Sequence, residues 1–255
     1  MEARGISLEW WVQLKDRVRA LTKRGPKGAD DHRFVKAVLW VLRTGAPWRD
    51  LPRGFGKWST VYRRYRRWAV AGRWEALRQS HEERRPCYLL IDSTIIKAHP
   101  HAAGALKKGE TAEEALGRSR GGFSTKLHAL VSEHGRLVRY LLTGGEVNDI
   151  TQAKQLVSRD IEGTGVVGDR AYASNEFVSH LEGLEFEVVI PARANRVVSR
   201  SINAEVYRRR NVIERWFGRL KQFRRIATRY DKTQSSYCGF IALGASQVAS
   251  SGWRA

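Results

Sequence analysis

The sequence predicts a small helical region followed by a larger α/β domain, in which helices flank a mixed sheet. Apolar residues recur at helical spacing before residue 86, whereas short runs typical of strands begin at Pro86. These strand runs then alternate with helical ones, an order that favours a sheet with helices packed on its faces. A charged run, "HEERR", and the proline separate the two patterns. We therefore expect two domains, 1–85 and 86–255.

Two helices joined by a Gly- and Pro-containing loop are expected in the first domain. The segment 30–44 opens on acidic residues and ends before Gly45. The segment 59–77 begins with the cap candidate Ser59 and has apolar residues along one face. Its opposite face carries Arg63, Arg64, Arg66 and Arg67. This arrangement favours a helix-turn-helix whose second helix meets DNA, although a small helical bundle with a solvated basic face would show the same pattern.

The second domain is expected to have the order β-β-β-α-β-α-β, followed by a long helix. The predicted strands lie within 87–99, 124–135, 136–149, 163–169 and 186–193, and the predicted helices within 149–161, 174–184 and 207–230. Catalytic groups in such sheets tend to lie at strand ends.

The net charge of +20 is unevenly distributed along the 255 residues. Both ends of the chain are basic, whereas the middle is close to neutral. Basic residues increase the affinity for a nucleic acid wherever they contact its phosphate backbone. We therefore expect a nucleic acid as the partner. The cysteines, Cys87 and Cys238, cannot build a disulfide framework. No signal peptide or membrane-spanning run is recognisable, so we expect a cytoplasmic, nucleoid-associated protein and no membrane partner.

Three acidic residues are the candidate catalytic groups. Asp92 follows the apolar run Tyr88 to Ile91, and Asp169 follows another apolar run. An acid at the end of a buried strand is costly unless it is hydrogen-bonded, paired or bound to a metal. Glu214 lies within an otherwise basic helix. For a single aspartate, a turn or capping role would be the ordinary explanation.

The helical pattern around Glu214 distinguishes it from a simple counter-ion. Tyr207, Arg210, Glu214 and Lys221 fall on one narrow stripe of a helical wheel, beside a buried apolar arc. A counter-ion role would account for Arg210 at i,i+4 spacing, but not for Tyr207 and Lys221. Two aspartates and one glutamate can hold a pair of Mg²⁺ or Mn²⁺ ions, which suit oxygen ligands and phosphodiester chemistry. Basic residues nearby would neutralise phosphate charge.

These motifs resemble those of the DDE transposases of bacterial insertion sequences. The spacing from Tyr207 through Arg210 and Glu214 to Lys221 is similar to the family's signature around its last acidic residue. "LIDSTIIKAH", "GRSRGGFSTKLHALV", "GGEVNDI" and "VVGDRAYAS" resemble the blocks around its first two aspartates. "GAPWRDLPRGFGKWSTVYRRYRRWAVAGRW" resembles the helical region that precedes the catalytic core in one branch. The resemblance extends over residues 33 to 245.

The resemblance implies a ribonuclease-H-like catalytic domain with Asp92, Asp169 and Glu214 as catalytic residues and metal ligands. It implies double-stranded DNA, both element ends and target DNA, as the partner. It also implies cleavage at element ends, attack of the freed 3′-OH on target DNA, and a homo-oligomer on DNA. Tyr207, Arg210 and Lys221 would position DNA near the acids, and the segment 59–78 would recognise the element ends.

Several alternatives remain at this level. Glu146 and Asp149 could replace Glu214 as the third acid, although both precede a predicted helix, where capping is the ordinary role. A DNA-binding protein without catalysis would need no metal. A metal-dependent nuclease would hydrolyse DNA strands without joining them.

Overall fold

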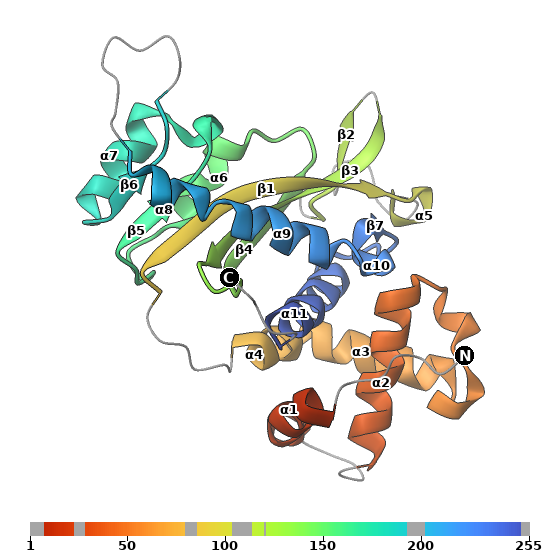
Figure 1. Ribbon diagram of the computed structural model, residues 1–255. Coiled ribbons are helices and arrows are strands. Elements are labelled where there is room, and N and C mark those ends of the chain that lie inside the picture. The colour runs from red at the N-terminus through yellow and green to blue at the C-terminus, as the bar shows by residue number, and fades with distance from the viewer. Residues whose placement is uncertain are drawn as a thin grey trace.

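The computed structural model describes residues 8–22, 29–79, 86–103, 114–119, 121–192 and 202–250 (Figure 1). The predicted boundary run at residues 81–85 lies outside these ranges. Within them, no helix is both long and apolar enough to cross a membrane.

The N-terminal region is helical, as predicted, but it is not a helix-turn-helix with a short turn. Its helices are α1 (Leu8–Leu21), α2 (Ala29–Thr44), α3 (Trp58–Val70) and α4 (Arg73–Gln79). Two 3₁₀ turns, η1 (Trp48–Asp50) and η2 (Arg53–Phe55), occupy the connection between α2 and α3. This connection is longer than the three or four residues typical of the motif. The N-cap of α3 is Lys57, so the cap predicted at Ser59 is wrong.

The second region is built on a mixed sheet, and the described part of the chain contributes seven strands to it. They are β1 (Tyr88–Ala98), β2 (Gly117–Ser119), β3 (Gly122–Ser132), β4 (Leu137–Gly144), β5 (Gly165–Val167), β6 (Glu187–Val189) and β7 (Thr228–Arg229). The main path runs β2-β3-β1-β5-β6, and β4 pairs with β3. Strand β3 runs antiparallel to its neighbours β1 and β4, whereas β5 and β6 run parallel to β1. The predicted ribonuclease-H-like mixed sheet is confirmed.

Helices cover the sheet as expected, but the predicted long helix at 207–230 is wrong. The chain forms α5 (Pro100–Ala103), α6 (Asp149–Leu156), α7 (Asn175–Gly183), α8 (Ala204–Arg208), α9 (Asn211–Leu220), α10 (Arg224–Ala227) and α11 (Gln234–Ser250). Turns at Arg209–Arg210 and after Leu220 interrupt the expected helix, and its last segment becomes strand β7 beside β1. In Figure 1, α8 and α9 run along β1.

The alternation of side chains along β1 assigns the two faces of the sheet. Leu90 and Ile96 belong to the larger core with α9 and α11, whereas Leu89 and Ile91 belong to a second core with α6 and α7. Because successive side chains point to opposite faces, Asp92 and Thr94 lie on the α9 face and Ser93 lies on the α6 face.

Helix α11 joins the N-terminal helices to the sheet. It contacts α3 and α4 on one side and α9 and β4 on the other. Eleven of its 17 residues are buried, which explains why apolar residues are not confined to one face of this helix. The larger core is consequently continuous from α1 to the sheet.

Candidate active site

Asp92 and Asp169 come together through the parallel pairing of β1 and β5. Leu90 pairs with Val167, the last residue of β5, and the two aspartates each follow two residues later. Because parallel strands keep their register, the two side chains emerge next to each other. The sequence predicted that Asp92 lies at the end of a strand, and this is wrong, because β1 continues to Ala98. It lies where the neighbouring strand β5 ends.

The carboxyl group of Asp92 is only partly exposed, at 21% of its side-chain surface. Burial raises its pKa from 3.8 to about 6. A hydrogen bond from the backbone N–H of Ser93, at 2.8 Å, and the charge of Arg210 oppose this rise. The negative charges of Asp169 and Asp149 add to it. Asp92 is therefore a carboxylate that a nearby cation would stabilise.

Asp169 is held by the turn that follows β5. It is the N-cap of η3 (Arg170–Tyr172), and its Oδ1 accepts a hydrogen bond of 2.8 Å from the N–H of Ala171. Capping and a place in the site are thus compatible for this residue, since the second carboxylate oxygen retains free lone pairs.

Glu214 lies on α9, and Arg210 links it to Asp92. The guanidinium of Arg210 forms an ion pair with the Glu214 carboxylate, and its Nη1 lies 3.6 Å from Oδ2 of Asp92. The Glu214 side chain is 49% exposed. Glu214 therefore serves as the counter-ion of Arg210 and also lies beside the candidate catalytic site, because Arg210 lies between Glu214 and Asp92.

The donor set only partly forms a metal site. Asp92 and Asp169 supply adjacent hard oxygen ligands whose mutual repulsion a divalent cation would relieve, so these two fit Mg²⁺ or Mn²⁺. Among the described residues, however, no group of three or more His, Cys, Asp or Glu side chains could hold a metal ion. Glu214 would have to exchange Arg210 for the cation in order to become a ligand.

The stripe predicted from the sequence assumed one continuous helix, but the turn at Arg209–Arg210 places Tyr207 on α8 and Glu214 on α9. Lys221 follows α9, and its Nζ donates a hydrogen bond of 2.6 Å to Oγ1 of Thr94, which lies on the same face of β1 as Asp92. Tyr207 is on α8 and packs, partly buried, against the larger core. Arg210, Glu214 and Lys221 thus line β1, whereas Tyr207 has a packing role as well.

The basic face of α3 forms a separate surface. The prediction that Arg64 belongs to this surface is wrong. A groove of about 680 Å³ is lined by α3 and the turn after it, with Arg63, Arg66 and Arg67 in its wall. Arg64 points elsewhere: its guanidinium forms ion pairs with Asp30 and Asp31 and lies 4.1 Å from the ring centroid of Phe34. The sequence did not predict this because helical periodicity alone does not show which acidic residues face the helix.

Three residues beside the aspartates were missed or underestimated. Asp149 is the first residue of α6 and not its N-cap, which is Asn148, and its Oδ1 lies 2.9 Å from Nζ of Lys126. Burial of Tyr172 in η3 raises the pKa of its hydroxyl well above the ordinary value, and the negative charges of Asp149, Asp92 and Asp169 add to the rise. The sequence signal for Asp149 was its place in "GGEVNDI"; nothing local marked Lys126 or Tyr172.

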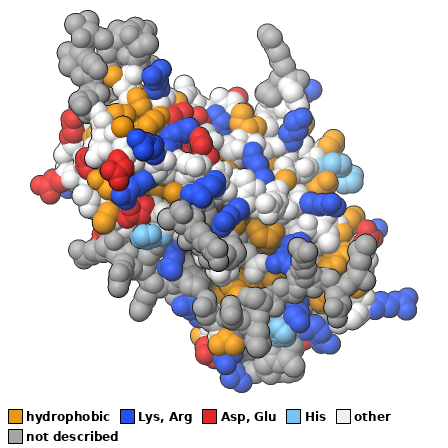
Figure 2. Space-filling model, in the orientation of Figure 1, with side chains coloured by type: hydrophobic (Ala, Val, Ile, Leu, Met, Phe, Trp, Pro, Cys, Tyr) orange, Lys and Arg blue, Asp and Glu red, His pale blue; other side chains and the backbone are white. Residues whose placement is uncertain are grey.

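The surface charge agrees with this arrangement. Figure 2 shows Lys and Arg side chains across the middle of one face, where α8 and α9 lie, and acidic side chains mainly toward α7 and β6.

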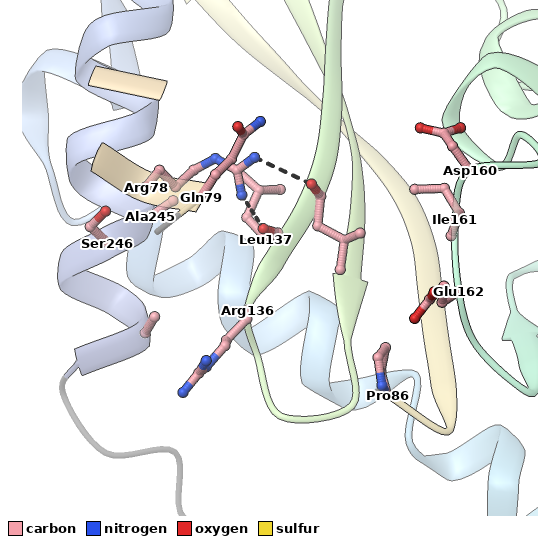
Figure 3. Close-up of a pocket in the computed structure, with 12 residues that line it drawn as sticks. Arg78, Gln79, Pro86, Arg136, Leu137, Asp160, Ile161, Glu162, Ala245 and Ser246 are labelled. Carbon is pink, nitrogen blue, oxygen red and sulfur yellow. Dashed lines mark hydrogen bonds between the residues drawn. The ribbon is translucent and has the colours of Figure 1, made fainter. Parts of the chain in front are cut away.

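A pocket of about 260 Å³ lies elsewhere, beside the starts of β1 and β5 (Figure 3). There Arg78 donates hydrogen bonds to the carbonyl oxygens of Leu137 and Val138. Because Asp92 and Asp169 lie toward the other ends of these strands, this pocket does not belong to the carboxylate site.

Two family models match the chain in succession. A model described as the transposase DDE domain matches residues 83–246, and a model for candidate transposases of the IS4/5 family matches residues 6–78. An uncharacterised protein of Sinorhizobium fredii, y4sN, is 41% identical over 108 residues, which is 41% of this chain and 86% of that protein. A protein of Brucella ovis, named as a candidate transposase for insertion sequence element IS6501, is 33% identical over 127 residues, 49% of this chain and 97% of that protein.

Solved structures resemble the chain only distantly. A pre-cleavage Mos1 transpososome is 12% identical with a TM-score of 0.25, and the match covers 90% of this chain and 81% of the transpososome chain. The Mos1 strand transfer complex is 11% identical with a TM-score of 0.28, and the match covers 91% of this chain and 82% of that one. At these scores the fold assignment depends on the strand order described above. The family assignment depends on the two models, which together extend over nearly the whole sequence. The chain therefore belongs to the DDE transposases of insertion sequences, with an N-terminal region of the IS4/5 type.

Proposed function

We propose that this protein is an active transposase that cleaves DNA at element ends and joins the freed 3′-OH to target DNA. Asp92, Asp169 and Glu214 are its catalytic carboxylates. The observation that supports this most strongly is the pair of aspartates at the end of β5, where burial and mutual repulsion leave Asp92 with a pKa of about 6. Membership of a family that is generally catalytic agrees with it.

The aspartates would bind divalent cations, with Glu214 as the third ligand. Bound there, Mg²⁺ or Mn²⁺ would activate the attacking water or hydroxyl and stabilise the departing oxygen of the phosphodiester. Arg210 would move its guanidinium from Glu214 to a phosphate oxygen as DNA enters, which releases the glutamate for the cation. In the structure Arg210 pairs with Glu214 and lies beside Asp92; after the exchange it would pair with the phosphate instead.

DNA would lie along α9 and β1, with a second contact at α3. Lys221 would supply charge next to Asp92, and Arg63, Arg66 and Arg67 would contact the element end. Tyr207 would support this surface from α8. The distribution of Lys and Arg in Figure 2 favours such a path.

The test compares isosteric variants in a cleavage and joining assay. Asp92→Asn, Asp169→Asn and Glu214→Gln keep side-chain volume but remove the charge that holds a cation. We expect each to lower cleavage and joining more than about a hundredfold in Mg²⁺ or Mn²⁺, with folding intact by circular dichroism. Labelled end DNA and a target duplex report both steps.

Matched controls are Glu146→Gln and Asp160→Asn, which remove the same charges outside the Asp92 neighbourhood and should retain activity. Wild-type rates from Asp92→Asn or Glu214→Gln would contradict the assignment. Cleavage without joined products would favour a nuclease. DNA binding in EDTA without any cleavage in Mg²⁺ or Mn²⁺ would favour a protein that only binds DNA.

A further inference from the structure

Most glycines within the described helices have an evident structural reason, but Gly218 does not. On α11, a Cβ at Gly239 would lie 2.9 Å from Cδ1 of Trp74, and a Cβ at Gly244 would lie 2.7 Å from its nearest neighbour. Gly183 is the last residue of α7, and glycine is common where helices end. Neither close packing nor helix termination explains Gly218, which lies inside α9.

Gly218 is exposed, and its backbone does not require glycine. Its φ is not in the left-handed region, and no described heavy atom would lie within 4 Å of a Cβ placed on it. Glycine destabilises the interior of a helix relative to alanine, because it loses more backbone entropy on folding. The described part of the chain therefore gives no reason for the missing side chain. A ligand that comes close to the helix backbone at this point would provide one.

Gly218 lies in a column of residues along the exposed side of α9. Arg210 is the N-cap of this helix and Lys221 is its C-cap. The column consists of Arg210, Glu214, Gly218 and Lys221, which follow one another at spacings of four, four and three residues. These spacings place all four on one side of the helix. Gly218 therefore leaves a gap in the column, between the side chains of Glu214 and Lys221.

The Lys221 end of this column connects it to the candidate active site. The Nζ of Lys221 donates a hydrogen bond of 2.6 Å to Oγ1 of Thr94 and lies 3.4 Å from the carbonyl oxygen of Ile95. Both contacts are to neutral oxygens, so they do not cancel the charge of the ammonium group. Thr94 lies on the same face of β1 as Asp92, roughly 7 Å farther along the strand. An anionic chain that passes Gly218 and Lys221 would therefore continue toward Asp92.

We propose that the sugar–phosphate backbone of a DNA strand crosses α9 at Gly218 on its way to Asp92 and Asp169. Because glycine has no side chain, a phosphate group can come close to the helix backbone there, and the Lys221 ammonium offsets its charge. Such a contact positions the strand without reading its base sequence. The Lys and Arg side chains over α8 and α9 in Figure 2 favour the same path. This inference rests on the proposed function, because it assumes that DNA reaches the carboxylates along α9.

The experiment measures binding of the full-length protein to a labelled element-end duplex by fluorescence anisotropy in EDTA, so that no cleavage occurs. Gly218→Ala and Gly218→Val add increasing volume at the proposed contact while keeping every charge. We expect the Kd to rise with side-chain volume, roughly fivefold to fiftyfold for Gly218→Val, because the added atoms displace the strand. Urea unfolding should show that Gly218→Ala is at least as stable as wild type, which excludes misfolding as the cause.

The matched control is Gly183→Val. Gly183 is also an exposed helical glycine with no described heavy atom within 4 Å of a Cβ, but it lies on α7, toward the acidic part of the surface in Figure 2. The same volume added there should leave the Kd within about twofold of wild type, because no phosphate contact is disturbed. Lys221→Met removes a charge and should reduce the salt slope by about one unit, whereas Gly218→Val should keep a slope closer to that of wild type.

The outcomes separate this inference from the proposed function. A wild-type Kd for Gly218→Val would overturn the inference alone, as would equal weakening by Gly183→Val. A change in the oligomeric state of Gly218→Val without DNA, measured by light scattering, would also overturn it, because α9 would then contact a second copy of the chain. If the wild-type protein does not bind the element-end duplex, the proposed function fails together with the inference.

Discussion

The partly exposed Asp92 carboxyl and the buried His128 imidazole lie on opposite faces of β1 and β3, and their pKa values shift in opposite directions. Asp92 rises to about 6, whereas His128 falls to about 4. In both cases burial is the largest cause, because it disfavours whichever form carries charge. Each group is consequently biased toward its neutral form.

The opposite shifts predict a pH dependence that one variant can isolate. His128 binds a proton at 6.5 when unfolded but only at about 4 when folded, so its contribution to stability is present above pH 6.5 and is lost as pH falls toward 4. Asp92, with its raised pKa, contributes in the opposite sense between 6 and 3.8. The two effects offset each other in the wild-type protein.

Urea unfolding of wild type and His128→Gln at pH 7 and pH 4.5 measures the histidine alone, since Asp92 is common to both. We expect the difference in unfolding free energy between the two proteins to shrink by roughly 2 kcal/mol on going to pH 4.5. A pH-independent difference would contradict the assignment of His128 as a buried neutral side chain.

At the scale of the element, α3 shows how one helix divides its arginines between two tasks. Val61, Tyr65 and Trp68 are buried as the helical pattern predicts. Arg63, Arg66 and Arg67 line the groove, whereas Arg64 turns toward Asp30 and Asp31 at the start of α2. Asp30 and Asp31 in the first turn of α2 therefore determine that Arg64 is the arginine held away from solvent.

This division predicts different outcomes for neighbouring substitutions. Arg63→Ala with Arg67→Ala should weaken binding to element ends and reduce the salt dependence by about one unit of slope for each phosphate that is no longer neutralised. Arg64→Ala should instead lower the unfolding free energy by roughly 2 to 4 kcal/mol, because it leaves the buried Asp31 carboxylate unpaired. Binding titrations across salt concentrations and urea unfolding distinguish the two. A normal salt slope for the double variant would remove α3 from the DNA interface.

At the scale of the whole molecule, α11 makes the two predicted domains share one core. Gly239 of α11 allows close contact with α3 and α4: a Cβ there would lie 2.9 Å from Cδ1 of Trp74 and 3.0 Å from the Tyr65 hydroxyl. The hydroxyl of Tyr65 also donates a hydrogen bond to the carbonyl oxygen of Ser236 on α11. The N-terminal helices are thus bonded to the C-terminal helix.

The shared core predicts that a change at this contact destabilises both regions together. Gly239→Val should lower the unfolding free energy by roughly 1 to 3 kcal/mol through overpacking, with a single transition seen by both tryptophan fluorescence and circular dichroism. Gly218→Val on α9, where a Cβ meets nothing within 4 Å, is the matched control and should change stability by less than about 0.5 kcal/mol. Two separate transitions in Gly239→Val would show that the regions fold independently, as the predicted boundary at residue 86 implies.

Most of the local structure could be predicted from the sequence. Periodicity identified α2, α3, α7 and the five main strands, and the apolar face of α9 is buried as expected. These features depend on neighbouring residues, whose spacing decides which side chains share a face. The break between α8 and α9 and the burial of α11 were not predicted, since both depend on what packs against them.

The sequence by itself determined the family and the three candidate acids, because ordered motifs and residue types can be read without knowing the fold. Only the tertiary structure decided how these residues meet. The β1 and β5 register brings Asp92 beside Asp169, α9 inserts Arg210 between Asp92 and Glu214, and α6 brings Asp149 toward them. Such contacts join segments far apart in the chain, and strand register and helix packing, which local periodicity does not encode, determine them.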